Sequence, residues 1–318
     1  MRSDQFKGYF FALLATISFS NVYIFSKAAM NGITQAHQVA GVNESGSWGE
    51  LIQFGFYWFL LAFLLNTIWS AYTGKLSYLR SIGRSQVKIL ILLGILEILT
   101  NTTFYLSIQI IPDPSVTSFL GNLYPVVLTL MGVTLLKERF SWIESAGVFF
   151  ALTGAFIISY TGETSLKNMF IPGTLVVLIN AIFASTTSIV GKVNIRKLTP
   201  ELITLNHTAW LLLYAFILMM VTGESWTIPA PAFTNIAIGS FLGPFMGVLM
   251  IYYSFKFIEA SRSSIVQSLK GIVVLIGAWL YFGTFPALHQ VIGGLFTVLG
   301  VLVMTLAQAR LIKSGKKC

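Results

Sequence analysis

Runs of about 20 apolar residues recur along the whole 318-residue chain, and they limit what it can fold into. A helix needs roughly 20 such residues to cross the hydrocarbon core of a bilayer. Ten runs of this kind can be drawn, each bounded by charge, proline or glycine. They cover residues 8–29, 51–72, 87–109, 115–136, 141–160, 171–191, 202–222, 235–257, 264–283 and 288–307. The sequence therefore predicts an all-α integral membrane protein with ten transmembrane helices.

The composition excludes the main alternatives to a membrane protein. Hydrophobic residues make up 55% of the chain and charged residues only 10%, whereas a soluble domain carries about 25% charged residues. The same figures exclude a disordered chain. A disulfide scaffold is excluded because Cys318 is the only cysteine. The first apolar run is too long for a removable signal peptide, so we expect it to be retained.

Helix-start signals support several of these boundaries. Ser141 and Glu144 form the pattern of a capping box where the fifth run begins. Thr199-Pro200-Glu201 places a cap, a first-turn proline and an acid at the start of the seventh. Pro112 and Pro114 interrupt the connection between the third and fourth runs.

The basic residues predict an orientation. If the ten runs alternate in direction, all but Lys27, Lys167 and Lys270 of the 20 Lys and Arg residues fall on the side of the two termini. Short cytoplasmic loops retain basic residues, so both termini, including a basic tail at 308–318, are expected in the cytoplasm. We predict a multi-pass protein of the cytoplasmic (inner) membrane. The formal charge of +9 is then a topogenic signal, and no nucleic-acid partner is expected.

The chain also contains an internal repeat. An offset of 146 places Leu123 on Leu269 and Gly147 on Gly293, an offset of 147 places Tyr105-Leu106-Ser107 on Tyr252-Tyr253-Ser254, and an offset of 165 places Gly8 on Gly173 and Lys27 on Lys192. The repeats cover 8–160 and 171–307, with five spans each. Because five is odd, the second repeat enters the membrane from the opposite side. Such inverted repeats form a cavity near the midplane that opens to one side at a time.

One stretch of the first repeat resembles a known family. Leu120-Gly121-Asn122-Leu123-Tyr124-Pro125-Val126-Val127, continuing through Leu135-Leu136-Lys137-Glu138-Arg139-Phe140-Ser141 to Gly147 and Gly154, is similar to the EamA domain of the drug/metabolite transporter superfamily. The resemblance implies two such domains, transport of small metabolites, often amino acids, and a cavity lined mainly by spans 1, 3, 4, 6, 8 and 9. The second copy departs from the pattern, with Lys270-Gly271 in place of Tyr124-Pro125 and Thr284 in place of Glu138.

Two charged residues lie deep within the predicted spans. Glu97 is near the middle of the third, and Lys270 is one or two turns into the ninth. Ionised side chains in a bilayer are costly and face the protein interior or water. Glu97 and Lys270 are therefore expected either to bind a solute or a coupling proton, or to form a salt bridge that joins the two halves.

Polar side chains at helical spacing surround these charges in the expected cavity. The predicted substrate-binding set is Glu97, Lys270, Asn101, Asn122, Tyr124, Tyr23, Tyr105, Gln267 and Asn180. The alternative for the small polar residues is that they hydrogen-bond helices together. Pro125 and Pro244 are expected to act as hinges or, alternatively, to produce static kinks. His207 is interpreted mainly as an interfacial histidine, with a proton-relay role as the alternative.

No motif indicates enzyme chemistry. The sequence lacks a phosphate loop, a GxSxG elbow and paired metal-ligand spacing, so neither cofactor nor metal is expected. We predict a carrier, exporting small metabolites such as amino acids by alternating access. A nucleotide-sugar or other polar-metabolite carrier is the alternative within transport, and a membrane enzyme or a sensor are alternatives outside it. The expected partners are the small-molecule substrate and the bilayer, with coupled protons and a second copy of the chain as further candidates.

Overall fold

The computed structural model describes residues 2–39, 47–136, 141–162, 170–194, 198–258, 263 and 266–313. These residues are helical apart from turns, short connections and an isolated bridge between Tyr160 and Phe170. The elements are α1 (Arg2–Val39), α2 (Ser47–Tyr72), η1 (Lys75–Ser81), α3 (Arg84–Ile110), α4 (Pro114–Leu120), α5 (Leu123–Leu136), α6 (Trp142–Ser159), α7 (Thr174–Asn194), α8 (Pro200–Thr222), α9 (Ala230–Ser240), η2 (Phe241–Gly247), α10 (Val248–Phe257), α12 (Lys270–Phe282) and α13 (Leu288–Lys313).

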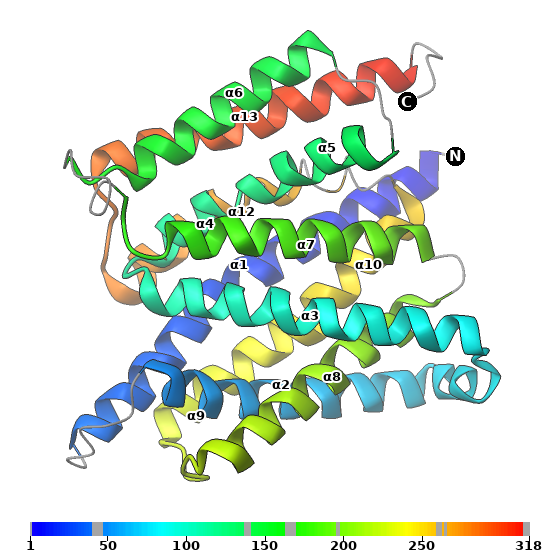
Figure 1. Cartoon of the computed structure of the whole chain (residues 1–318), viewed down its shortest axis with the longest axis vertical. Coiled ribbons are helices and arrows are strands. Elements are labelled where there is room, and N and C mark those ends of the chain that lie inside the picture. Colours follow the sequence, from blue (N-terminus) through cyan, green and yellow to red (C-terminus); the bar gives the residue numbers. More distant parts are fainter. Residues whose placement is uncertain are drawn as a thin grey trace.

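The all-helical membrane class is confirmed. Within the described part of the chain, seven helices are long and apolar enough to cross a membrane, and Lys270–Phe282 and Leu288–Met304 are shorter apolar helices. The start of α1 and the end of α13 lie at the same end of the bundle (Figure 1). The count of ten spans, the inverted relation of the repeats and the position of the cytoplasm stay predictions. Part of the charge pattern behind that orientation lies outside the described residues, at Lys137, Arg139, Lys167, Arg196, Lys197, Arg262, Lys316 and Lys317, as do Glu138 and positions 314–318 of the basic tail.

Two predicted boundaries need correction. The first helix does not end near residue 29 but continues to Val39. The fourth run is not one helix, because α4 ends at Leu120 and α5 begins at Leu123 after a turn at Gly121-Asn122. Pro125 is accordingly in the first turn of α5, where a missing backbone N–H breaks no helical hydrogen bond. The break in this run lies before the proline.

The predicted helix starts are confirmed. The Ser141 N–H donates to Glu144 Oε2 (2.6 Å), and the Glu144 N–H donates to Ser141 Oγ (3.2 Å), which completes a capping box on α6. Thr199 Oγ1 accepts from the Leu202 N–H (3.3 Å) at the start of α8. These bonds satisfy amides that the first turn of a helix leaves unpaired.

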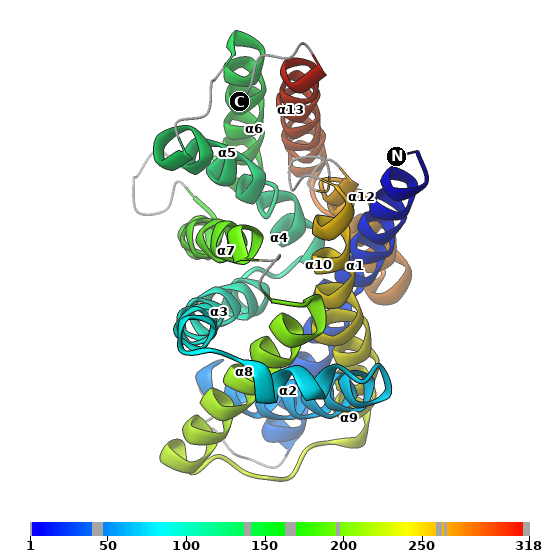
Figure 2. The same cartoon turned by 90° about the vertical axis from the view of Figure 1, so that its right-hand side faces the viewer.

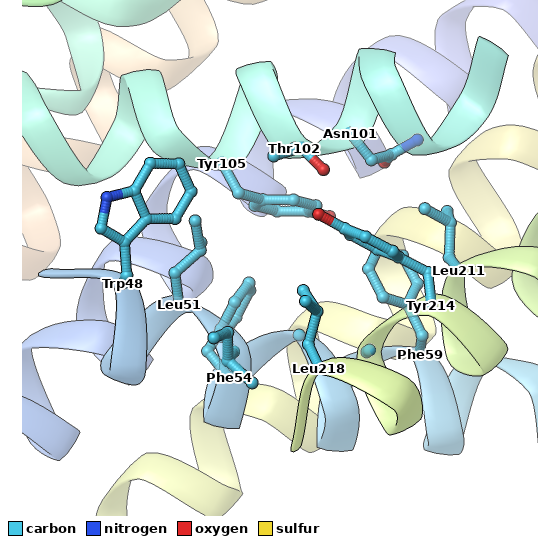
Figure 3. Close-up of a pocket in the computed structure, with 13 residues that line it drawn as sticks. Trp48, Leu51, Phe54, Phe59, Asn101, Thr102, Tyr105, Leu211, Tyr214 and Leu218 are labelled. Atoms are coloured by element: carbon cyan, nitrogen blue, oxygen red, sulfur yellow. The ribbon is translucent and has the colours of Figure 1, made fainter. Parts of the chain in front are cut away.

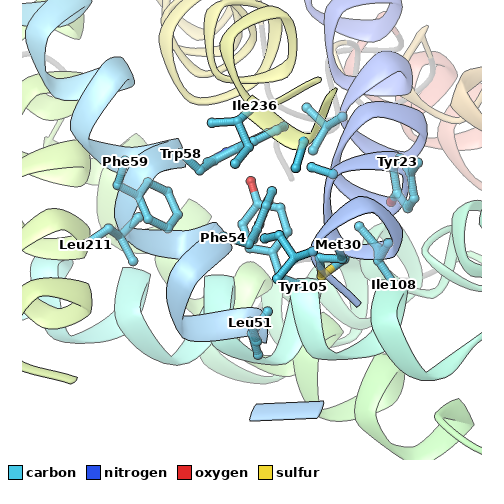
Figure 4. Packing of buried hydrophobic residues seen from close by; sticks show 14 of the residues in the cluster. Tyr23, Met30, Leu51, Phe54, Trp58, Phe59, Tyr105, Ile108, Leu211 and Ile236 are labelled. Atoms are coloured by element: carbon cyan, nitrogen blue, oxygen red, sulfur yellow. The ribbon is translucent and has the colours of Figure 1, made fainter. Parts of the chain in front are cut away.

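The helices form two groups around a central region. One group is α2, α8 and α9, and the other is α6 and α13, which lie side by side at the opposite end of the molecule (Figures 1 and 2). The elements between them are α1, α3, α4, α5, α7, α10 and α12. The largest buried cluster joins α1, α2, α3 and α9 through Met30, Phe54, Trp58, Tyr105 and Ile236 (Figure 4).

Glycines let α6 and α13 approach to backbone contact. A Cβ at Gly147 would lie 2.7 Å from the carbonyl oxygen of Gly300, and one at Gly154 would lie 2.5 Å from that of Gly293. The small faces predicted from the sequence therefore pack against each other, as small residues do between membrane helices. The two contacts exchange equivalent positions of the two repeats, because Gly293 and Gly300 lie 146 residues after Gly147 and Gly154.

A Gly300→Ala substitution tests this interface. The new Cβ would lie 2.4 Å from the Ala151 nitrogen and 2.6 Å from the Gly147 oxygen, so only a backbone shift can accommodate it. We expect a destabilisation of about 1–3 kcal/mol, measured as a lower melting temperature in detergent. The matched control is Gly55→Ala in α2, where a Cβ would meet nothing within 4 Å. Equal melting temperatures for the two variants would contradict the assigned packing.

Candidate functional site

A cavity of about 170 Å³ lies where the central helices meet. Its wall is made by one face of each of α1, α3, α5, α7, α10 and α12, with contributions from α8 and η2. The lining residues are Phe19, Val22, Tyr23, Glu97, Thr100, Asn101, Phe104, Tyr105, Gly121, Tyr124, Asn180, Ala184, Thr187, Ser188, His207, Gly243, Pro244, Val248, Ile251, Tyr252, Phe255, Gln267 and Lys270.

Most of the residues proposed from the sequence lie on this wall. They are Glu97, Asn101, Tyr105, Tyr23, Tyr124, Asn180, Gln267 and Lys270, together with Pro244. Asn122 and Pro125 are not on it. Asn122 is buried at the turn between α4 and α5, where its Nδ2 is 3.4 Å from Thr297 Oγ1 of α13 and donates to it. In this structure Asn122 joins helices instead of facing the cavity.

Glu97 has a partner that the sequence did not indicate. Its Oε2 lies 2.9 Å from Nδ1 of His207, and both side chains are less than 10% exposed. Asn101 Nδ2 donates to the same carboxylate oxygen at 3.1 Å and to the Glu97 carbonyl at 2.9 Å. His207 therefore lies in the cavity wall, which corrects its interpretation as an interfacial histidine. The missed signal is the buried face of α8, where Thr204, Thr208 and Leu211 share its side of the helix.

Lys270 has no carboxylate partner among the described residues. Its Nζ lies 5.6 Å from the centre of the Phe19 ring, a cation–π contact. Glu97 pairs with His207 instead, so the salt bridge between Glu97 and Lys270 that the sequence left open does not form in the described part of the chain. Lys270 is also the first residue of α12. The positive end of the α12 dipole and the ammonium therefore lie together, and both favour an anion.

Other polar side chains of the wall tie the helices together. Tyr124 donates to Ser188 Oγ (2.8 Å), Asn180 Nδ2 donates to the Thr100 carbonyl (2.7 Å), and Gln267 Nε2 donates to Ser263 Oγ (3.1 Å). Each bond joins two segments or fixes a side chain in the wall. The interpretation of small polar residues as links between helices thus holds for these contacts. The two charged groups, in contrast, face space.

A second pocket lies beside the first and differs in chemistry. It measures about 50 Å³ and lies between α2, α3 and α8 (Figure 3). Its wall is almost wholly apolar, with Trp48, Leu51, Phe54 and Leu218 among its residues. Asn101 and Tyr105 of α3 line both spaces. The charged groups belong to the larger cavity alone, so that cavity is the candidate site.

The lining residues correspond between the two repeats. An offset of 165 carries Phe19, Val22 and Tyr23 of α1 onto Ala184, Thr187 and Ser188 of α7. An offset of 147 carries Glu97, Asn101, Phe104 and Tyr105 onto Pro244, Val248, Ile251 and Tyr252, and an offset of 146 carries Gly121 and Tyr124 onto Gln267 and Lys270. Equivalent faces of both repeats therefore enclose the cavity, although the charges on them differ.

Comparisons with known proteins agree with this architecture. The model of the EamA-like transporter family matches residues 6–160 and, a second time, residues 171–306. The chain is 24% identical over 223 residues to the uncharacterized transporter YyaM of Bacillus subtilis (strain 168), which covers 67% of this chain and 71% of that protein. A protein of known crystal structure shares the fold over 92% of this chain and 99% of its own, with a TM-score of 0.60 and 14% sequence identity.

Cysteine labelling tests the cavity. In a Cys318→Ser background, we expect Ser188→Cys to react with the anionic reagent MTSES, because Ser188 lines the cavity. Ser185→Cys is the matched control, since Ser185 lies one turn earlier in α7 and is fully buried. Adding Lys270→Gln should slow the reaction of Ser188→Cys with MTSES relative to a cationic reagent. Equal labelling at 185 and 188 would show that the cavity wall is misassigned.

Proposed function

Because this chain belongs to the EamA-like transporter family, we propose that it exports small zwitterionic metabolites such as amino acids by alternating access. The observation that carries the proposal is the pair of opposite poles in the cavity. Lys270 and the start of α12 supply a positive pole, and Glu97, held by His207 and Asn101, supplies a carboxylate. A solute with both a carboxylate and an ammonium group satisfies both poles at once.

The rest of the wall suits the apolar part of such a solute. Aromatic rings of α1, α3, α5 and α10 line the cavity, namely Phe19, Tyr23, Phe104, Tyr105, Tyr124, Tyr252 and Phe255. Ligand sites combine such apolar surfaces with a few placed polar groups. An amino acid fits this division into charged backbone and less polar side chain. The same division favours a carrier over an enzyme, because the described wall holds no nucleophile and base arranged for attack.

The correspondence of the lining residues supports the transport cycle. We propose ten spans arranged as two inverted repeats, with both termini in the cytoplasm and the cavity close to the midplane of the cytoplasmic membrane. Equivalent segments of two such repeats can exchange conformations, which opens the cavity to each side in turn. The turn at Gly121-Asn122 and the π-helix around Pro244 border the cavity, where irregular backbone is tolerated in a membrane protein.

The cavity volume and its charge favour a small zwitterion over a nucleotide sugar. Sites for larger, drug-sized ligands measure about 300–1,000 Å³, against about 170 Å³ here. A diphosphate also needs several cationic donors, and Lys270 is the single Lys or Arg among the described lining residues. Proton coupling, if present, is best supported at Glu97 and His207, because two titratable groups 2.9 Å apart can share a proton.

Proteoliposome uptake tests the proposal. We expect vesicles containing the protein to take up a ¹⁴C-labelled mixture of L-amino acids and to exclude UDP-glucose. Uptake of UDP-glucose alone would replace the proposal with the nucleotide-sugar alternative. Uptake of neither solute would reject the amino-acid assignment.

Substitutions of the two poles test their roles. Lys270→Gln and Glu97→Gln should each lower uptake at low solute concentration about tenfold or more, because each removes a charge-assisted hydrogen bond worth about 1.5–3 kcal/mol. The matched control is Lys88→Gln at the exposed start of α3, which should transport at the wild-type rate. Wild-type uptake by both cavity variants would remove the poles from the site.

A further inference from the structure

Lys27 ties α1 to the end of α3. Its Nζ donates to the carbonyl oxygens of Ile108 (2.9 Å), Gln109 (2.9 Å) and Ile111 (3.1 Å). These are among the last carbonyls of α3, which the helix cannot satisfy itself. An ammonium at this position also meets the negative end of the helix dipole. Lys27 thus caps a helix of the cavity from the neighbouring helix.

This contact lies directly beyond one end of the cavity. Along α1, the last lining residue before Lys27 is Tyr23, one turn earlier. Along α3, the last lining residue before Ile108 is Tyr105, again about one turn earlier. Ile108 is fully buried. The contact made by Lys27 therefore holds α1 and α3 together where the cavity stops.

The end of α10 repeats the end of α3. The Ile111 N–H donates to the Ser107 carbonyl (3.0 Å), and 147 residues later the Ile258 N–H donates to the Ser254 carbonyl (2.8 Å). The two serine hydroxyls also match, since Ser107 donates to the Phe104 carbonyl and Ser254 donates to the Ile251 carbonyl. By the same offset, the carbonyls equivalent to those held by Lys27 belong to Phe255, Lys256 and Ile258.

The second repeat also has an equivalent lysine. Lys192 of α7 lies 165 residues after Lys27, with the offset that relates the lining residues of α1 and α7. Its side chain is exposed, and it donates no hydrogen bond among the described residues. The preceding residue, Gly191, lies against α10, because a Cβ there would be 3.2 Å from Tyr252 Cε1. Lys192 thus lies close to the helix whose end matches that of α3, but without the contact.

We propose that Lys27 and Lys192 are alternating latches of the transport cycle. In the state seen here, Lys27 caps α3 and closes one end of the cavity, and the other end is unlatched. In the opposite state, Lys192 caps α10 through the carbonyls of Phe255, Lys256 and Ile258, and Lys27 is released. The inference rests on the proposed alternating access and assigns to it the two groups that hold each end shut.

The two lysines differ in what their loss should do. Lys27→Met removes the contact of the present state, and we expect this state to lose at least tenfold in population relative to the opposite one, since hydrogen bonds to charged groups of this strength shift equilibria by that much. Lys192→Met removes a contact of the opposite state only. It should leave the present structure and its melting temperature unchanged, and yet slow transport.

Labelling at the closed end is the decisive measurement. In a Cys318→Ser background, Ser26→Cys reports opening at Lys27, because Ser26 is fully buried here. We expect Lys27→Met to raise MTSES labelling of Ser26→Cys about tenfold, Lys192→Met to lower it, and Lys27→Arg to restore protection because arginine keeps the donors. Lys88→Met is the control and should change nothing.

The outcomes separate this proposal from the proposed substrate. Unchanged labelling of Ser26→Cys in Lys192→Met would overturn the alternating latch, even if Lys27→Met fails to fold. A response of labelling to both lysines, together with no uptake of the amino-acid mixture, would support the latches and reject the substrate. Lower uptake in Lys192→Met with an unchanged melting temperature would support both proposals.

Discussion

Hydrocarbon supplies no hydrogen-bond partner, and this constraint determines most of the structure. Every backbone group within the membrane must be satisfied by the protein, so the spanning segments are helices. Charged side chains face the same constraint. Glu97 is paired with His207, Lys27 is held by three carbonyls, and Lys270 faces the cavity beside a ring. Each charge within the described spans is therefore placed against protein or against the space that a solute would enter.

The deviations from regular helix gather where this constraint is relaxed. The chain turns at Gly121-Asn122 before α5, and the equivalent segment of the second repeat turns at Ser268-Leu269 before α12. The π-helix with Pro244 lies on the same wall. A polar cavity can hydrate or bind backbone groups that lipid cannot. These irregular segments are hence located at the cavity and not on the lipid-facing surface.

The two repeats contribute equal shapes but unequal chemistry. Gly147 and Gly154 contact Gly300 and Gly293 symmetrically, because only close backbone packing is required there. In the cavity, by contrast, Tyr124 corresponds to Lys270 and Glu97 to Pro244. A solute with two different ends needs two different poles. The common fold thus provides the enclosure, and the substitutions within it provide the selectivity.

Local patterns predicted much of this protein. Runs of 20 apolar residues indicate spanning helices because the bilayer has a fixed thickness, and the capping box at Ser141 and Glu144 involves neighbours in the sequence. The glycines of α6 and α13 were recognised as packing residues for the same reason. Helical spacing also placed Glu97, Asn101 and Tyr105 on one face of α3, and they share the cavity wall.

Partners that are distant in the sequence were decided only by the tertiary structure. His207 is 110 residues from Glu97, and nothing in the local pattern of α8 shows which helix it meets. The same holds for Asn122, whose partner Thr297 belongs to α13, and for the carbonyls that Lys27 caps on α3. The sequence determined by itself that the chain enters the membrane as helices with a few buried charges, because hydrophobicity and helical period are local properties. Which charge meets which depends on how the helices pack, and packing is a property of the whole molecule.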